Sequence, residues 1–167
     1  PQKLGYTLYG VTHREETAKK ARERKLANVV DTDPIILKNC SIIYIALPLE
    51  HLLNPSSVLI DAIPKNAVVT DVGSVKVPIL NTWKKLHPRF IASHPMTGTE
   101  NSGVHSGQYN LFKNKPWVVT PDKETDQKAL EIIHQISLSL GCKWISTEAS
   151  IHDEAVSLIS HLPVLVS

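Results

Sequence analysis

A histidine among glycine and hydroxyl residues is the feature of this sequence best suited to chemistry. Residues 93–107 read Ser-His-Pro-Met-Thr-Gly-Thr-Glu-Asn-Ser-Gly-Val-His-Ser-Gly and directly follow the apolar run Phe90–Ala92. A strand that ends at His94 would place the imidazole at a sheet edge, where open α/β sheets bind ligands. Because the unperturbed pKa of histidine lies near neutrality, His94 is a candidate acid or base. The alternative is a structural histidine in a surface loop.

A second segment brings a hydroxyl to a similar position. Ala67–Val72 is a β-branched run that predicts a short strand, and Gly73 and Ser74 follow it. Glycine permits a sharp turn, and Ser74 would then stand near the start of the next helix. Ser74 is therefore predicted to cap that helix, to orient a neighbouring histidine or touch a cofactor, or to do both.

Composition excludes several classes of function. The 167 residues can form one domain, with or without part of another, and 18 basic against 16 acidic residues give a formal charge of only +2. This balance is not typical of a nucleic-acid-binding protein. Cys40 and Cys142 match no metal-ligand spacing and predict reduced thiols. No signal peptide or membrane span is recognised, so we expect a cytoplasmic protein, or a plastid stromal one for a plant-type source.

Strands and helices are expected to alternate along the chain. Such alternation predicts an α/β fold with a doubly wound, mostly parallel sheet. The predicted strands are Tyr6–Thr12, Val29–Val30, Ser41–Leu47, Ala67–Val72, Phe90–Ser93, Trp117–Thr120 and Lys143–Ser146. The predicted helices are Glu15–Lys25, Leu49–Ile63 with a break near Pro55, Val77–Leu86, Asp126–Leu140 before Gly141, and one that begins at Ser150.

Both ends of the chain are predicted to fall inside secondary-structure elements. The opening residues resemble a helix that ends at Gly5, and the apolar helical pattern of 156–166 does not end within the sequence. A doubly wound fold needs an earlier strand and phosphate-binding turn, yet no G-x-G-x-x-G occurs. We expect a piece of a longer protein; a small, complete and unusual fold is the alternative.

Four sequence blocks together resemble a known family. They are Asp71-Val-Gly-Ser-Val-Lys76, His94-Pro-Met-Thr-Gly-Thr-Glu100 with Ser102-Gly103, Lys115-Pro-Trp-Val-Val-Thr-Pro121, and His152-Asp153 followed by Ser160-His-Leu-Pro163. In this order and at these separations they are similar to the prephenate/arogenate dehydrogenases of tyrosine biosynthesis, above all the cyanobacterial arogenate type. The resemblance implies a Rossmann-like nucleotide-binding domain over 1–149. It also implies that 150–167 begin a helical dimerisation domain, which makes a homodimer the expected assembly.

The resemblance also implies roles for individual residues. His94 matches the catalytic histidine that engages the ring hydroxyl of the substrate, and Ser74 matches the hydroxyl that orients it near the nicotinamide. The positions that match substrate-binding residues are Thr99, Glu100, Asp153 and His161. The positions expected to line the cofactor site are Thr12, His13, Arg14, Leu47, Pro48, Gly73, Ser74 and Met96.

The choice of cofactor and substrate is argued from two positions. His13 and Arg14, rather than a carboxylate, follow the predicted strand that ends at Thr12, and an arginine there accommodates the 2′-phosphate of NADP. NADP is therefore expected rather than NAD, although Arg14 could be a solvated surface residue. Many relatives carry a histidine directly after Ser-His-Leu-Pro, where this chain has Val164. This departure favours arogenate over prephenate.

Two other readings of the sequence stay open. A Rossmann-like fold does not imply catalysis, so the chain could be a binding or regulatory module that lost the chemistry. It could also belong to another nicotinamide-dependent dehydrogenase family, of the 6-phosphogluconate type. No metal site is expected.

Overall fold

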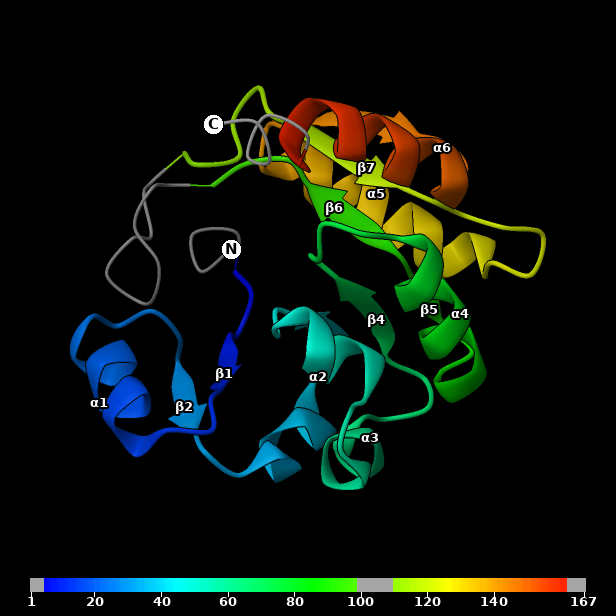
Figure 1. Cartoon of the computed structure of the whole chain (residues 1–167). Helices are drawn as coiled ribbons and strands as arrows, with labels where there is room; N and C mark the ends of the chain where they lie inside the picture. The colour runs from blue at the N-terminus through cyan, green and yellow to red at the C-terminus, as the bar shows by residue number, and fades with distance from the viewer. Residues whose placement is uncertain (1–4, 99–109, 162–167) are drawn as a thin grey trace.

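The computed structural model describes residues 5–98 and 110–161, with side chains up to Ile159. Figure 1 shows strands and helices that alternate along the chain, which confirms the predicted α/β class. Within the described ranges, no helix is both long and apolar enough to cross a bilayer.

The described strands are mostly parallel and form three separate sheets. The parallel pair β1–β2 is the first sheet, the parallel strands β3–β4–β5 are the second, and β6–β7–β8 are the third. In the third sheet β6 runs antiparallel to β7, which runs parallel to β8. The strand bounds are β1 Tyr9–Val11, β2 Val29–Asp31, β3 Ile42–Ile45, β4 Val68–Asp71, β5 Phe90–Ile91, β6 Ser93–Pro95, β7 Pro116–Val119 and β8 Lys143–Ser146.

Most of the helices connect consecutive strands, and α6 and η3 follow β8. Their bounds are α1 Glu15–Glu23, the 3₁₀ helix η2 Pro34–Asn39, α2 Leu49–Leu53, α3 Ser57–Ala62, α4 Val77–Leu86, α5 Gln127–Ser139, α6 Ala149–Val156 and the π-helical turn η3 Ser157–His161. Asp126 caps α5 by accepting hydrogen bonds from the N–H groups of Lys128 and Ala129. Gly141 follows α5 with a φ of +76°, a conformation that favours glycine at the end of a helix.

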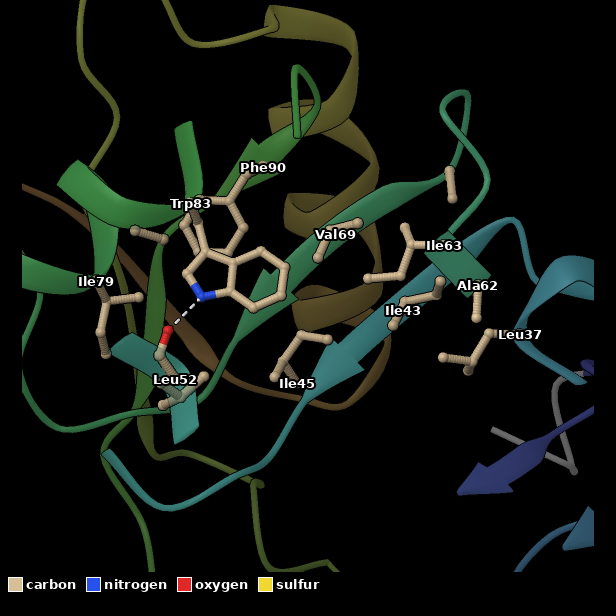
Figure 2. Close-up of a cluster of buried hydrophobic side chains, with 12 residues drawn as sticks. Leu37, Ile43, Ile45, Leu52, Ala62, Ile63, Val69, Ile79, Trp83 and Phe90 are labelled. Carbon is tan, nitrogen blue, oxygen red and sulfur yellow. Dashed lines mark hydrogen bonds between the residues drawn. The ribbon is translucent and has the colours of Figure 1, made fainter. Parts of the chain in front are cut away.

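A tryptophan organises the core beneath the carboxyl ends of the central strands. The Trp83 side chain of α4 is fully buried, stacks on Phe90, and donates a hydrogen bond of 2.8 Å from Nε1 to the Leu52 carbonyl (Figure 2). This bond fixes α2 against α4. The two helices that follow β3 and β4 are therefore held together at the edge of the sheet where a ligand is expected.

Two predicted elements have the observed bounds, and several others differ. The helix Val77–Leu86 and the strand Lys143–Ser146 are confirmed, and the break near Pro55 separates α2 from α3. The predicted strand Tyr6–Thr12 is too long, since pairing with β2 covers only Tyr9–Val11. The prediction of a helix up to Lys25 is wrong, because Lys25 has a φ of +51°.

The segment that carries His94 also differs from its prediction. Phe90–Ser93 is not one strand: β5 pairs with β4, Ala92 lies between, and β6 pairs with β7 on the other side. His94 therefore lies within a strand instead of at the start of a loop. The physical reason is the antiparallel partner β7, which keeps the backbone extended through Pro95.

Candidate active site

His94 lies on β6, where it pairs with Val118 of β7. The ring is partly buried, and its Nδ1 atom lies 3.0 Å from Nε2 of His152. The two rings meet edge to face, with centroids 5.2 Å apart and planes at 76°. His152 comes from α6, so strand and helix meet at this histidine pair.

The second ring nitrogen of His152 has a charged partner. Nδ1 of His152 lies 2.7 Å from Oδ1 of Asp153, and the His152 side chain is buried. His94, His152 and Asp153 therefore form a continuous chain of side-chain contacts. Such a chain can fix ring orientation and tautomer, because Nδ1 of His94 and both ring nitrogens of His152 each have one defined neighbour.

Asp153 is held in place by the start of α4. Its carboxylate accepts hydrogen bonds from the backbone N–H of Lys76 at 2.6 Å and of Val77 at 2.9 Å. Burial raises the pKa of Asp153, but the bonds from Val77, His152 and Lys76 outweigh burial and lower it. Asp153 is therefore a carboxylate that caps a helix far away in the sequence.

This capping corrects one prediction about Ser74. Ser74 does not cap α4. Lys76 holds the N-cap position, but its side chain makes no capping hydrogen bond; the Asp153 carboxylate accepts from the N–H groups of Lys76 and Val77 instead. The Ser74 side chain is exposed, and within the described residues its hydroxyl has no hydrogen-bond partner. Its predicted role in orienting His94 stays a prediction.

A fully buried ion pair supports the strand behind His94. The ammonium of Lys76 contacts Oδ2 of Asp71 and donates to the Ser93 carbonyl at 2.7 Å. Asp71 also accepts from the backbone N–H groups of Ser93 at 3.0 Å and Gly73 at 2.8 Å. Burial raises the pKa of Asp71 and lowers the pKa of Lys76, while their attraction opposes both shifts. The pair ties the loop after β4 to the residue that precedes His94.

The surroundings of His94 favour its neutral form. Burial lowers its pKa most, the nearby His152 and Lys76 lower it further, and Asp153 opposes them, which gives a value of about 4. A neutral imidazole at physiological pH can accept a proton from a substrate hydroxyl. His94 is therefore a candidate general base.

Gly73 is required by space and not by a positive φ. A Cβ atom there would lie 2.7 Å from Cδ1 of Ile79, 3.0 Å from Cδ1 of Leu52 and 3.1 Å from Oδ2 of Asp71. The expected freedom to turn is therefore less important than the close approach of the loop to α2 and α4. This approach keeps the loop with Ser74 against the buried ion pair.

The residues expected to hold the cofactor follow the carboxyl ends of three parallel strands. Thr12, His13 and Arg14 follow β1, and the two glutamates of the first turn of α1 are already paired, Glu15 with Arg22 and Glu16 with Lys20. The Arg14 side chain is exposed and donates from Nε to Nε2 of His13 at 3.1 Å. His13 and Arg14, and not a carboxylate, therefore lie between Thr12 and the start of α1.

The other expected cofactor residues lie on the next strands. Leu47 and Pro48 are exposed after β3, and Gly73 and Ser74 follow β4. Met96 follows β6 and donates its N–H to the Pro116 carbonyl at 2.9 Å. Because β3 and β4 are parallel neighbours, the residues that follow these two strands lie at one edge of their sheet and can share one ligand.

Three expected substrate-binding residues cannot be placed. Thr99 and Glu100 lie outside the described residues, and so does the side chain of His161. In the described part of the chain, no group of three or more histidine, cysteine, aspartate or glutamate residues could hold a metal ion.

Reasoning from the sequence missed part of this site. The roles of His152, Lys76 and Asp71 were not predicted, although all three lie in the blocks quoted above. Their partners are distant in sequence: 58 residues separate the histidine pair and 77 separate Lys76 from Asp153. The adjacent His152-Asp153 pair at the start of a helix was the one available signal.

The comparison with protein families agrees with the resemblance. The family described as prephenate dehydrogenase, nucleotide-binding domain, matches residues 2–146. The chain belongs to this family. Its α/β fold agrees with a nucleotide-binding domain, and the match favours this family over dehydrogenases of the 6-phosphogluconate type.

Individual relatives are similar over most of the chain. The cyclohexadienyl dehydrogenase of Zymomonas mobilis is 30% identical over 142 residues, which are 84% of this chain and 48% of that protein. The crystal structure of Synechocystis arogenate dehydrogenase is 36% identical with a TM-score of 0.89, covering 99% of this chain and 59% of that one. Prephenate dehydrogenase from A. aeolicus, solved with hydroxyphenyl propionate and NAD+, is 27% identical with a TM-score of 0.91 and the same coverage. The chain thus spans roughly half of its relatives' length.

Proposed function

We propose that the whole protein catalyses the oxidative decarboxylation of arogenate to tyrosine with NADP, and that it acts less well on prephenate. The observation that carries this proposal is His94, a partly buried imidazole kept neutral at the carboxyl side of a family nucleotide-binding fold. A neutral base is what the ring hydroxyl of a cyclohexadienol needs in order to become a carbonyl.

The residues of this chain perform the proton chemistry. Nε2 of His94 accepts the proton of the ring hydroxyl as the carbon–oxygen double bond forms and the ring carbon loses hydride. The bound nicotinamide would take up that hydride. The ring carboxylate then leaves as carbon dioxide, its bonding electrons complete the aromatic ring, and the former carbonyl oxygen takes a proton back from His94 to become the phenol hydroxyl. Aromatisation makes the overall step effectively irreversible.

The residues at the strand ends are compatible with a nicotinamide dinucleotide. Arg14 and His13 would hold the 2′-phosphate of NADP, because the nearby glutamates are paired within α1. Leu47, Pro48, Gly73, Ser74 and Met96 would line the remainder of the cofactor site. The NAD+ in the A. aeolicus structure shows that a relative binds a nicotinamide cofactor; NADP for this protein is our proposal.

The strand order indicates where the phosphate-binding turn belongs. In the described residues, β1 pairs only with β2, and β3 pairs only with β4 and not with β1. In the doubly wound order, the strand that carries the glycine-rich turn lies between these two. We infer that this strand lies between β1 and β3 in the whole protein.

The remaining parts of the proposal concern substrate and assembly. Thr99, Glu100, Asp153 and His161 are proposed to bind substrate, Ser74 to orient His94, and Val164 to favour arogenate. Residues from 150 onward are proposed to begin a helical domain through which two copies form a cytoplasmic or plastid homodimer. No part of this proposal involves nucleic acid or a membrane.

Assays of the full-length protein test the proposed function. Arogenate and prephenate should each be supplied with NADP and with NAD, while the reduced nicotinamide and the aromatic product are measured. We expect tyrosine and NADPH to form together in equal amounts from arogenate. Nicotinamide binding without turnover of either substrate would instead support a binding module and contradict the proposal.

A further inference from the structure

We propose that His152 is a positioning residue that holds His94 in one tautomer, with its proton on Nδ1 and the lone pair of Nε2 free for the substrate. The observation is the chain of contacts His94–His152–Asp153, whose two distances are 3.0 Å and 2.7 Å. The kinetic consequence of this inference rests on the proposed function, whereas the tautomer itself does not.

The tautomer follows from the carboxylate at the end of the chain. Asp153 is ionised and already accepts two backbone N–H groups, so it can only accept a hydrogen bond from His152. His152 must therefore carry a proton on Nδ1. In neutral His152 the Nε2 atom is then a hydrogen-bond acceptor, and the facing Nδ1 of His94 must donate to it. One proton on Nδ1 of neutral His94 leaves Nε2 unprotonated.

The support for this chain is rigid at both ends. His152 is 4% exposed, and its backbone N–H is bonded within α6 to the Glu148 carbonyl at 3.0 Å. Asp153 is fixed to the first residues of α4, and Lys76 bonds from its backbone to Asp153 and from its ammonium to the Ser93 carbonyl. The same lysine thus anchors the carboxylate and the strand residue next to His94. His152 is held where it can orient the base.

The arrangement also gives the transferred proton a defined environment. When His94 accepts a proton at Nε2, its Nδ1–H still points at Nε2 of His152, and Asp153 stabilises the positive charge through His152. The third member of a Ser-His-Asp triad acts comparably, by selecting the tautomer of a base and stabilising its cation. Here a second histidine lies between the base and the carboxylate.

Nitrogen NMR on the wild-type, full-length protein tests the tautomer directly. With histidine nitrogen-15 labelling and long-range proton–nitrogen correlation, protonated and unprotonated ring nitrogens have distinct shifts. We expect His94 to be protonated on Nδ1 near neutral pH, with its signals assigned by their loss in His94→Asn. Protonation of His94 on Nε2 in the wild type would overturn the inference, whatever the protein's activity.

Two substitutions of His152 test the kinetic consequence. His152→Leu removes the acceptor at similar volume, and His152→Gln retains an amide oxygen that can accept from Nδ1 of His94. We expect kcat to fall roughly 10- to 100-fold in His152→Leu with little change in KM, and to recover in part in His152→Gln. Asp153 is a poorer target, because its substitution would also uncap α4.

A second buried histidine provides the matched control. His87 is 6% exposed and contacts the Pro64 carbonyl and the Arg89 N–H, away from His94. His87→Leu should lower stability without lowering kcat. If His152→Leu and His87→Leu had equal effects on kcat, or if His152→Gln gave no recovery while folded, His152 would be merely structural. If the tautomer is as expected but neither substrate reacts, the proposed function fails and the tautomer assignment stands.

Discussion

The protonation state of His94 is the residue-scale property with the clearest consequence. Burial of the ring lowers the pKa of His94 most, His152 and Lys76 lower it further, and Asp153 raises it. The lowered pKa keeps the imidazole neutral as the pH falls through 6.5, and the neutral form is lost only near pH 4. His94 itself therefore stays neutral throughout the neutral and mildly acidic range.

The neutral state of His94 predicts the pH profile of the full-length enzyme. kcat/KM for arogenate should stay level from about pH 8 down to about pH 5.5, because the acid limb reports the base of the free enzyme. Initial rates in buffers of constant ionic strength provide the measurement. A tenfold loss centred on pH 6.5 would show that His94 titrates as an ordinary histidine.

Arg14 supports a second prediction at the residue scale. If it binds the 2′-phosphate, Arg14→Ala should weaken NADP and leave NAD nearly unchanged. A charge-assisted phosphate contact contributes about 1.5–3 kcal/mol, so the NADP/NAD preference should fall at least roughly tenfold. Dissociation constants for both cofactors provide the measurement, with Arg24→Ala at the other end of α1 as control. Equal losses for both cofactors would make Arg14 structural.

At the scale of elements, the buried pair of Asp71 and Lys76 joins β4, α4 and β6. Removing one partner leaves the other charge buried and unpaired, which costs about 3–5 kcal/mol. Lys76→Met and Asp71→Asn should each lower the free energy of unfolding by about 3–5 kcal/mol. The double variant should lose less than the sum of both, by about 1–3 kcal/mol, because the two groups interact directly.

Denaturant unfolding of the three variants measures this coupling. Lys84→Met is the matched control: it lies on the same helix, its side chain is partly exposed, and it lies 3.4 Å from Asp122. Lys84→Met should lower the free energy of unfolding by less than about 1 kcal/mol, as is usual for surface ion pairs. Additive losses in the double variant would mean that the two buried charges act independently.

Elements were more predictable than the contacts between them. The apolar and β-branched runs predict β3 and β4, although β4 is buried throughout and β3 buries only Ile43 and Ile45. Pro78 in the first turn marks the start of α4. The 3₁₀ helix η2 was not predicted, although Asp33 caps it and Pro34 begins it. His152 could not be matched to His94, because nothing in a local pattern shows which distant elements will pack together.

At the scale of the whole molecule, the proposed preference for arogenate is argued from Val164. Val164 lies outside the described residues, so the argument for it comes from the sequence. Valine cannot donate a hydrogen bond to the keto acid side chain of prephenate. We predict a higher kcat/KM for arogenate than for prephenate with NADP. In Val164→His the ratio of the two kcat/KM values should fall, because kcat/KM for prephenate rises. Steady-state kinetics on both substrates measure this, and a clear preference of the wild type for prephenate would reverse the assignment.

The central claim is that His94 is the base of an oxidative decarboxylation. The most direct measurement is kcat for arogenate with NADP in the full-length wild type and in His94→Asn, with His134→Asn on α5 as a histidine control. The claim predicts that His94→Asn lowers kcat by roughly two to four orders of magnitude while folding and cofactor binding are preserved, and that His134→Asn has little effect. A folded His94→Asn enzyme with near wild-type kcat would contradict it.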